Sequence, residues 1–230
     1  MTSPYLSIVL PIYNEEQRLG KCLARLLDYF WHYTHIPFEI VCVLNGCTDR
    51  SFAIARQFSK RWPQMNILSL PEAGKGAAIK AGMLAAMGKY RMMMDVDLAT
   101  PPTEIPRFLK AAWSGVDLVA GVRTYRHASP LRRLAHSGYR LLARPLTWVR
   151  DPQCGFKLFT AACADDVFSH LKTTGWGFDV EALYLAGDGY RIVELEVPWI
   201  HDNNSKLHIF RDSVKMARDL LLIRKLHKTT

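Results

Sequence analysis

Short apolar runs alternate with amphipathic stretches through the first half of the chain. The runs predict buried strands, and apolar residues spaced three or four positions apart predict helices that cover a sheet. Strands are expected over residues 6–10, 38–44, 66–70 and 90–94, and helices over residues 15–30, 49–60 and 75–87. This alternation is typical of a mostly parallel sheet with right-handed crossovers. In such sheets ligands bind beyond the carboxyl ends of the strands, which is where Asn14, Asn45, Lys75 and Asp95 fall.

The second half has a less regular pattern. Strands are expected over residues 117–121, 155–159 and 190–197, with helices over residues 178–186 and 207–226. Residues 132–148 and the last helix both carry leucines among arginines and lysines. Such basic amphipathic helices lie at an anionic membrane surface or pack on the domain with a solvated basic side. Because no repeat or linker is visible, we expect a single α/β domain over residues 1–230.

Composition narrows the classes of function. A chain of 230 residues with 49% hydrophobic content can build one sizeable core, and no apolar run is long enough to span a bilayer. Five cysteines without a CxxC pair, and an N-terminus without a signal-peptide pattern, indicate a reduced, cytoplasmic setting. The net charge of +9 favours an anionic partner, either phosphates or an anionic membrane face. No nucleic-acid partner is expected, because no zinc-finger or aromatic RNA-binding motif is present.

Two carboxylates, Asp95 and Asp97, follow the apolar run 90–94 directly. Ionised carboxylates are costly to bury without a partner, so a strand that ends in two of them should point them at positive charge. Hard oxygen ligands suit Mg²⁺ or Mn²⁺, and such ions commonly bind substrate phosphates as well. Taken alone, such a triplet is more often a solvated turn at a strand end, and the motifs that follow it along the chain reverse that preference.

Two further loops carry polar candidates. Gly74-Lys75-Gly76 precedes a helix, where free amides and the lysine charge could meet a phosphate. It is not a Walker loop, and an ordinary glycine turn is the alternative. The turn at 44–49 ends in Asp49, which is either the helix N-cap or part of a polar lip that binds a base or ribose.

The order of these motifs resembles family-two glycosyltransferases of the GT-A fold. The resemblance rests on the segments 8–16, 45–49, 74–76 and 95–97. Three later segments are similar to the dolichyl-phosphate β-glucosyltransferase branch, namely 151–159, 176–181 and 197–206. Together they cover nearly the whole chain, and their order and spacing are more specific than any one motif.

The resemblance implies an inverting transfer of glucose from UDP-glucose to a polyprenyl phosphate of the dolichyl type. Residues 1–121 would bind the nucleotide sugar and residues 122–230 the acceptor. By position, the donor site would comprise Pro11, Tyr13, Glu15, Asn45, Asp49, Lys75, Asp95 and Lys206. Asp95 and Asp97 would hold the Mg²⁺ or Mn²⁺ cofactor. His201 could complete the metal shell, although a lone loop histidine is more often structural.

One departure concerns the nucleotide base. Many relatives carry Asp-Asp-Gly-Ser where this chain has Leu44-Asn45-Gly46-Cys47. The Asn45 amide can still hydrogen-bond a uracil edge, because it offers both a donor and an acceptor.

On the acceptor side, the resemblance places Arg123, Arg132 and Arg133 against the acceptor phosphate, and we assign Arg123 and Arg133 to the catalytic group with Asp97 and Asp151. A solvated basic helix face is the alternative for the arginines. Asp151 could be an acceptor-side carboxylate, a general base or the partner that orients an arginine. A phosphate oxygen is already anionic and needs no base, whereas a sugar hydroxyl does.

Three other functions remain open at this point. GDP-mannose could replace UDP-glucose, since the motifs do not specify the sugar epimer. The acceptor could be a hydroxyl group, which would require Asp151 as base. The chain could also be a binding module without catalysis, but the intact pair of Asp95 and Asp97 argues against this, because such a module could lose a metal carboxylate freely. We expect a transferase that docks peripherally on the cytoplasmic face of a membrane, with Trp176 along the sugar or prenyl path.

Overall fold

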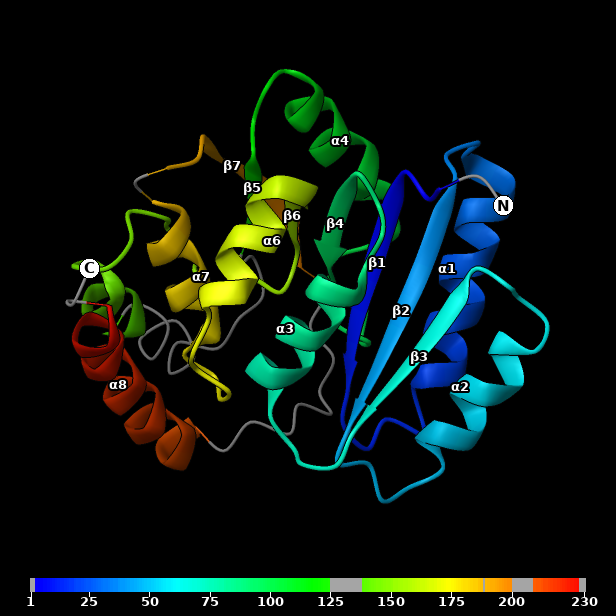
Figure 1. Ribbon diagram of the computed structural model, residues 1–230, viewed down its shortest axis with the longest axis horizontal. Coiled ribbons are helices and arrows are strands. Elements are labelled where there is room, and N and C mark those ends of the chain that lie inside the picture. Colours follow the sequence, from blue (N-terminus) through cyan, green and yellow to red (C-terminus); the bar gives the residue numbers. More distant parts are fainter. Residues whose placement is uncertain (1–2, 125–137, 188, 200–208, 228–230) are drawn as a thin grey trace.

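The computed structural model describes residues 3–124, 138–187, 189–199 and 209–227. Its strands are β1 (Leu6–Ile12), β2 (Phe38–Asn45), β3 (Met65–Leu70), β4 (Tyr90–Met93), β5 (Leu118–Thr124), β6 (Lys157–Thr160) and β7 (Ile192–Pro198). They form one sheet in the order β3-β2-β1-β4-β6-β5-β7. Only β6 runs antiparallel to its neighbours, β4 and β5, among these described strands. The predicted mixed α/β, mostly parallel sheet is therefore confirmed (Figure 1).

Helices cover both faces of the sheet. They are α1 (Leu19–Tyr33), α2 (Ser51–Ser59), α3 (Lys75–Ala85), α4 (Ile105–Trp113), α6 (Ala161–His170), α7 (Phe178–Ala186) and α8 (Ile209–Leu226). A 3₁₀ turn, Pro102–Glu104, precedes α4, and residues 138–143 are also helical. None of these described helices combines the length and the apolar content that a bilayer crossing requires.

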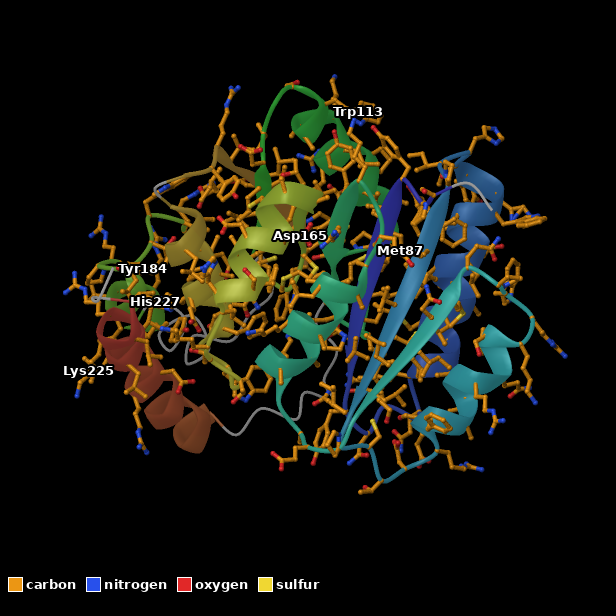
Figure 2. The ribbon with its side chains drawn as sticks, in the orientation of Figure 1. Met87, Trp113, Asp165, Tyr184, Lys225 and His227 are labelled. Carbon is orange, nitrogen blue, oxygen red and sulfur yellow. The ribbon has the colours of Figure 1, made fainter. Side chains whose placement is uncertain are left out.

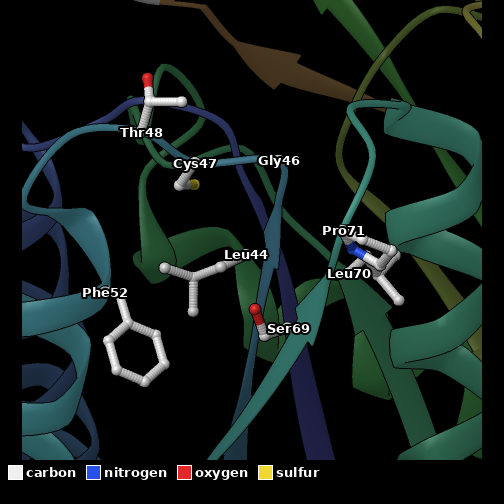
Figure 3. A pocket seen from close by; sticks show the side chains of 8 residues that line it. All are labelled: Leu44, Gly46, Cys47, Thr48, Phe52, Ser69, Leu70 and Pro71. Carbon is white, nitrogen blue, oxygen red and sulfur yellow. The ribbon is translucent and has the colours of Figure 1, made fainter.

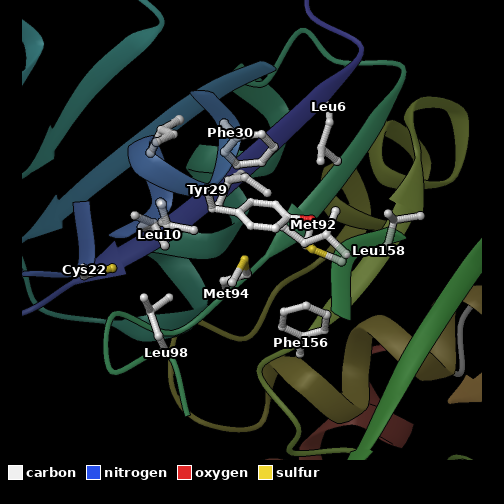
Figure 4. Close-up of a cluster of buried hydrophobic side chains, with 14 of the residues drawn as sticks. Leu6, Leu10, Cys22, Tyr29, Phe30, Met92, Met94, Leu98, Phe156 and Leu158 are labelled. Atoms are coloured by element: carbon white, nitrogen blue, oxygen red, sulfur yellow. The ribbon is translucent and has the colours of Figure 1, made fainter. Parts of the chain in front are cut away.

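Two apolar layers hold the helices on the sheet. Side chains from α1, α2 and α4 share one buried cluster with Leu6, Ile8 and Leu10 of β1 (Figure 4). Side chains from α3, α6 and α7 share the other with Val9. The alternation of β1 residues between two apolar layers explains why its sequence is continuously hydrophobic, as is usual for a parallel strand buried on both faces.

Strand β1 continues past Pro11, where the sequence pattern places its end. Pro11 has no N–H to donate, so it fits a strand only where no hydrogen bond is needed. Val9 and Pro11 present their backbone groups to the same side, towards β4. Strand β4 pairs with β1 only as far as Met93 opposite Val9, so beyond that point β1 loses no ladder bond to the proline.

Candidate active site

Asp95 and Lys75 meet at the carboxyl edge of the sheet. Lys75 is the first residue of α3, and its Nζ lies 2.7 Å from Oδ1 of Asp95 just after β4. Burial would raise the pKa of Asp95, but the charge and hydrogen bond of Lys75 outweigh it and lower the pKa. For Lys75, burial would lower the pKa, but Asp95 and Asp179 raise it. The pair therefore stays ionised near neutral pH.

Asp97 has a different environment from Asp95. Its side chain is exposed, and Oδ1 accepts a hydrogen bond from the Ala99 N–H at 3.0 Å. Loss of water on its protein-facing side and the negative charge of Asp95 raise its pKa. The two acids are thus close enough to repel each other, and Asp97 is the more exposed of the two.

The antiparallel direction of β6 brings a second part of the chain to this edge. Because β6 runs antiparallel to β4, it starts where β4 ends, and the segment before Lys157 passes beside Asp95. A Cβ on Gly155 would overlap Oδ2 of Asp95. Only glycine at this position lets the backbone approach the carboxylate so closely.

A buried ion pair between Lys157 and Asp179 holds the segment that precedes β6. Lys157 is fully buried, and its Nζ donates to Asp179 Oδ1 and Cys154 O at 2.6 Å and to Pro152 O at 2.8 Å. Burial raises the pKa of Asp179, and the Lys157 charge opposes that rise. All three N–H donors of the lysine are matched with acceptors, as a buried charge requires.

Arg123 and Asp151 form the acceptor-half pair. Nε and Nη2 of Arg123 donate to Oδ2 and Oδ1 of Asp151, both at 2.7 Å, and the Arg123 backbone N–H donates to Oδ2 at 3.0 Å. Asp151 is 1% exposed, whereas the Arg123 side chain is 18% exposed. The Arg123 guanidinium carbon also lies 5.9 Å from the ring centre of Trp199. This bidentate geometry favours the interpretation that Asp151 orients Arg123.

The loops after β1 and β2 are tied together by side-chain hydrogen bonds. Asn45, which is buried, donates to Ile12 O at 2.8 Å and accepts from the Gly74 N–H at 3.0 Å. Asn14, at a positive φ of 52°, accepts from the Thr48 N–H at 2.8 Å. The side-chain amide of Asn45 therefore links the end of β2 to the end of β1 and to the start of α3 at the candidate donor site.

Other predicted donor residues surround these ties. Asp49 accepts from the Ser51 N–H and from the Glu16 N–H, both at 2.9 Å. The N-cap of α2 is Arg50, so the alternative that Asp49 is the N-cap is wrong; Asp49 instead joins the first turn of α2 to the loop after β1. Glu15 pairs with Arg18 at 2.8 Å. Tyr13 is 47% exposed, and Pro11 is half-buried beside it.

A shallow cavity of about 300 Å³ lies beyond Gly46, between the β2 and β3 ends and α2 (Figure 3). Its lining includes Cys47, Thr48, Phe52 and Pro71. Gly46 has a left-handed φ of +64°, and a Cβ there would lie 2.7 Å from the Ala73 N atom. Glycine therefore lets this turn pack closely against the loop after β3.

Arg132, Arg133, His201 and Lys206 lie outside the described residues, so their predicted roles stay predictions. Of the helix amides expected to be free at α3, that of Ala77 donates to Thr174 O at 3.2 Å. The sequence analysis did not identify Lys157 or Gly155 as part of the site. The signal for both was their place inside the 151–159 motif, where a charged residue and a glycine interrupt an otherwise apolar strand.

Comparison with known proteins identifies the family. The model of Glycosyl transferase family 2 matches residues 7–167. Dolichyl-phosphate β-glucosyltransferase of Dictyostelium discoideum is 32% identical to the chain, covering 96% of it and 74% of the relative. The protein of that name from Homo sapiens is 32% identical and covers 95% and 74%.

Solved structures show the same fold at lower identity. Glucosyl-3-phosphoglycerate synthase from Mycobacterium tuberculosis, in complex with phosphoglyceric acid, superposes with a TM-score of 0.72 at 20% identity, over 96% of this chain and 80% of that one. Its complex with Mn²⁺, UDP and glucosyl-3-phosphoglycerate gives 0.72 at 19% identity, over 99% and 81%. These structures confirm the GT-A fold. The chain, a glycosyltransferase, belongs to glycosyl transferase family 2 and, within it, to the dolichyl-phosphate β-glucosyltransferases.

Proposed function

We propose that the protein transfers glucose from UDP-glucose to a dolichyl-type polyprenyl phosphate, with inversion, at a membrane surface. The names of its relatives support the reaction. The observation that carries the acceptor class is the Arg123–Asp151 pair. Asp151 is buried and accepts three N–H groups from Arg123, so it is poorly placed to take a proton from a hydroxyl. An anionic phosphate oxygen needs no such base and is attracted by the arginine.

On the donor side, we place the base and ribose over Pro11, Tyr13 and Glu15, with Asn45 and Asp49 shaping the rim. Lys75 would face the diphosphate, where its positive charge opposes the negative charge that develops on the leaving group. Asp95 holds Lys75 in that position through their 2.7 Å ion pair. Lys75 would therefore place positive charge at the leaving diphosphate, and Arg123 would place it at the acceptor phosphate.

Asp95 and Asp97 fit a divalent cation. No cluster of three or more metal-ligating side chains occurs among the described residues, but Mg²⁺ is commonly bound by one or two carboxylates together with substrate phosphates. Burial raises the pKa of Asp97, and the negative charge of Asp95 adds to that rise; a divalent cation held by these residues would offset the repulsion between the two acids. A bound Mg²⁺ or Mn²⁺ would supply Lewis-acid stabilisation of the departing diphosphate.

One panel of assays tests the reaction. Purified protein with Mn²⁺ or Mg²⁺ is offered UDP-glucose or GDP-mannose, together with a short polyprenyl phosphate or a sugar-hydroxyl acceptor. We expect glucosyl transfer to the phosphate that stops in excess chelator. Asp97→Ala should abolish it with an unchanged thermal midpoint, while Asp28→Ala, at an exposed position of α1, should behave as wild type. Arg123→Ala should raise the KM for the acceptor and leave donor binding unchanged.

Several results would reject the proposal. Full activity in chelator or in Asp97→Ala would remove the metal role. Preferred transfer of mannose would replace the donor, and transfer to a hydroxyl that survives Arg123→Ala would replace the acceptor. Nucleotide binding without transfer to any acceptor would indicate a binding module.

The membrane surface would be contacted through α8 and the helix at 138–143. The two helices pack on each other through Tyr139, Leu220 and Ile223. They leave exposed apolar side chains (Leu141, Leu142, Leu221 and Leu222). Exposed basic side chains accompany these leucines (Arg140, Arg144, Arg218 and Arg224). Apolar insertion combined with basic charge is the usual basis of binding to anionic lipid.

Vesicle sedimentation tests this surface. The protein should bind phosphatidylserine-containing vesicles at low salt and dissociate at high salt, because exposed charges are screened. A Leu221→Ser and Leu222→Ser double variant should bind more weakly. Met87→Ser, which changes a residue that is 66% exposed and lies on another part of the molecule (Figure 2), should not. Equal recovery of wild type and double variant with vesicles would argue against this face.

A further inference from the structure

The N-terminus of α3, which carries Lys75, rests on the backbone of another segment. We define the 172–177 turn as the irregular residues between α6 and α7. A Cβ on Gly76 would lie 2.5 Å from Thr173 O, and one on Gly74 would lie 2.9 Å from Thr174 O. The Ala77 N–H donates to the same Thr174 oxygen. The position of this turn therefore determines where Lys75 lies relative to the carboxyl edge of the sheet.

The turn also contacts Lys75 directly. Nζ of Lys75 lies 5.4 Å from the ring centre of Trp176, within the range of a cation–π interaction. The lysine is thus held between Asp95 on one side and Trp176 on the other. A displacement of the turn would move both the backbone below Lys75 and the ring beside it.

The turn lies outside regular secondary structure, and two carboxylates accept hydrogen bonds from its backbone N–H groups. Glu181, which is fully buried, accepts from the Lys172 N–H at 2.8 Å and from the Thr173 N–H at 2.7 Å. Asp219 of α8 accepts from the Gly177 N–H at 3.1 Å. The first end of the turn is therefore held from α7, and the second end from α8. Hydrogen bonds from backbone N–H groups to ionised carboxylates are among the stronger ones in proteins.

The fit between Asp219 and Gly177 is close. A Cβ on Gly177 would lie 2.5 Å from Cβ of Asp219 and 3.1 Å from its Oδ2. The C-terminal end of α8 is fixed to the same region, because His227 Nε2 lies 2.7 Å from Glu181 Oε1 and Lys172 Nζ donates to Leu226 O at 2.8 Å. Helix α8 thus contacts the 172–177 turn at two places, through Asp219 and through its C-terminal end.

We propose that Asp219 is a positioning residue for the donor site: it fixes Gly177, and through the 172–177 turn it sets where Trp176 and Lys75 meet the nucleotide diphosphate. This inference rests on the proposed function for the identity of the ligand. It does not require Asp219 to touch the substrate. Loss of its carboxylate should weaken donor binding through Lys75 while the sheet remains folded.

Three variants test the proposal. Asp219→Ala removes the acceptor of the Gly177 N–H, whereas Asp219→Asn keeps a carbonyl oxygen that can accept it. Gly177→Ala leaves Asp219 in place but inserts a methyl group between the turn and α8. Asp165→Ala is the matched control, because Asp165 of α6 pairs with Arg91 of β4 and lies away from α8 (Figure 2).

The measurements are the Kd of UDP-glucose with Mn²⁺ by calorimetry, the thermal midpoint, and hydrogen exchange of the ligand-free protein. Asp219→Ala and Gly177→Ala should weaken donor binding about tenfold and speed exchange in residues 74–79 as well as 172–178. Asp219→Asn should stay within about threefold of wild type. Asp165→Ala should leave both the donor Kd and the exchange over residues 74–79 unchanged, even if it lowers the thermal midpoint equally.

Wild-type donor affinity and wild-type exchange over residues 74–79 in Asp219→Ala would overturn the proposal. So would an Asp219→Asn variant as impaired as Asp219→Ala. If the wild-type protein binds no nucleotide sugar, the proposed function fails. Exchange over residues 74–79 in the ligand-free protein then decides the positioning role by itself.

Discussion

At the scale of single residues, the site depends on contacts that no local pattern reveals. Asp95, Asp97 and Lys75 were predicted from their places after a strand and before a helix, and the structure brings Lys75 and Asp95 into contact. Asp151 could be predicted as a site residue, but its role could not, because it depends on a partner 28 positions earlier. Lys157 was missed for the same reason, since its acceptor Asp179 lies 22 positions later.

Gly155 offers a sharp test at this scale. Gly155→Ala should lower transfer by about a hundredfold, because the new methyl group would displace the Asp95 carboxylate, and misplacement by about 1 Å can cost that much. The assay is glucosyl transfer, with circular dichroism to check the fold. Gly189→Ala is the control, since a Cβ there meets nothing within 4 Å. Full activity in Gly155→Ala would show that Asp95 can move without consequence.

At the scale of elements, hydrophobic periodicity predicted most strands and helices to within a few residues. The 178–186 helix was predicted with its observed bounds. Two helices, α4 and α6, were not predicted. Proline at the start of α4, and the alanine and aspartate content of the short α6, weaken the local pattern. Both helices are stabilised by packing on the sheet through residues such as Phe108 and Phe168, a tertiary effect that propensity does not report.

Asn45 tests how these elements are joined at the sheet edge. Asn45→Ala should lower the free energy of unfolding by about 2 kcal/mol, because Ile12 O and the Gly74 N–H would lose their buried partner. Urea denaturation measures this change. Asn66→Ala removes a hydrogen bond to Glu39 Oε2 at 2.8 Å from an exposed position of neighbouring β3; because water can replace Asn66 there, it should cost less than about 1 kcal/mol. Equal losses in the two variants would mean that Asn45 does not connect the elements.

At the scale of the whole molecule, the two halves share one sheet. The sequence suggested a donor half at 1–121 and an acceptor half at 122–230, and that division stays a prediction about ligands. As structure, β6 of the second half lies between β4 of the first half and β5, which spans the boundary between the two. The sequence could not predict this insertion, because a four-residue strand carries no signal for its direction or its neighbours.

An isolated fragment of residues 1–121 should therefore fail to bind the donor. It would lack Gly155 beside Asp95 and the turn beneath Lys75, and its β4 would have one unpaired edge. We expect no calorimetric binding of UDP-glucose with Mn²⁺, and loss of the fragment to aggregates on gel filtration. The full chain is measured in parallel. A soluble fragment with the affinity of the full chain would show that the first half is autonomous.

The place of β6 in the sheet also has a consequence for biosynthesis. While the chain leaves the ribosome, β4 and β5 emerge early, but the strand that separates them arrives only with Thr160. Until then, two open edges are available to each other and to neighbouring chains. Slow translation over residues 125–160, or a chaperone that shields those edges, should decide the yield of folded protein more than the stability of the finished enzyme does.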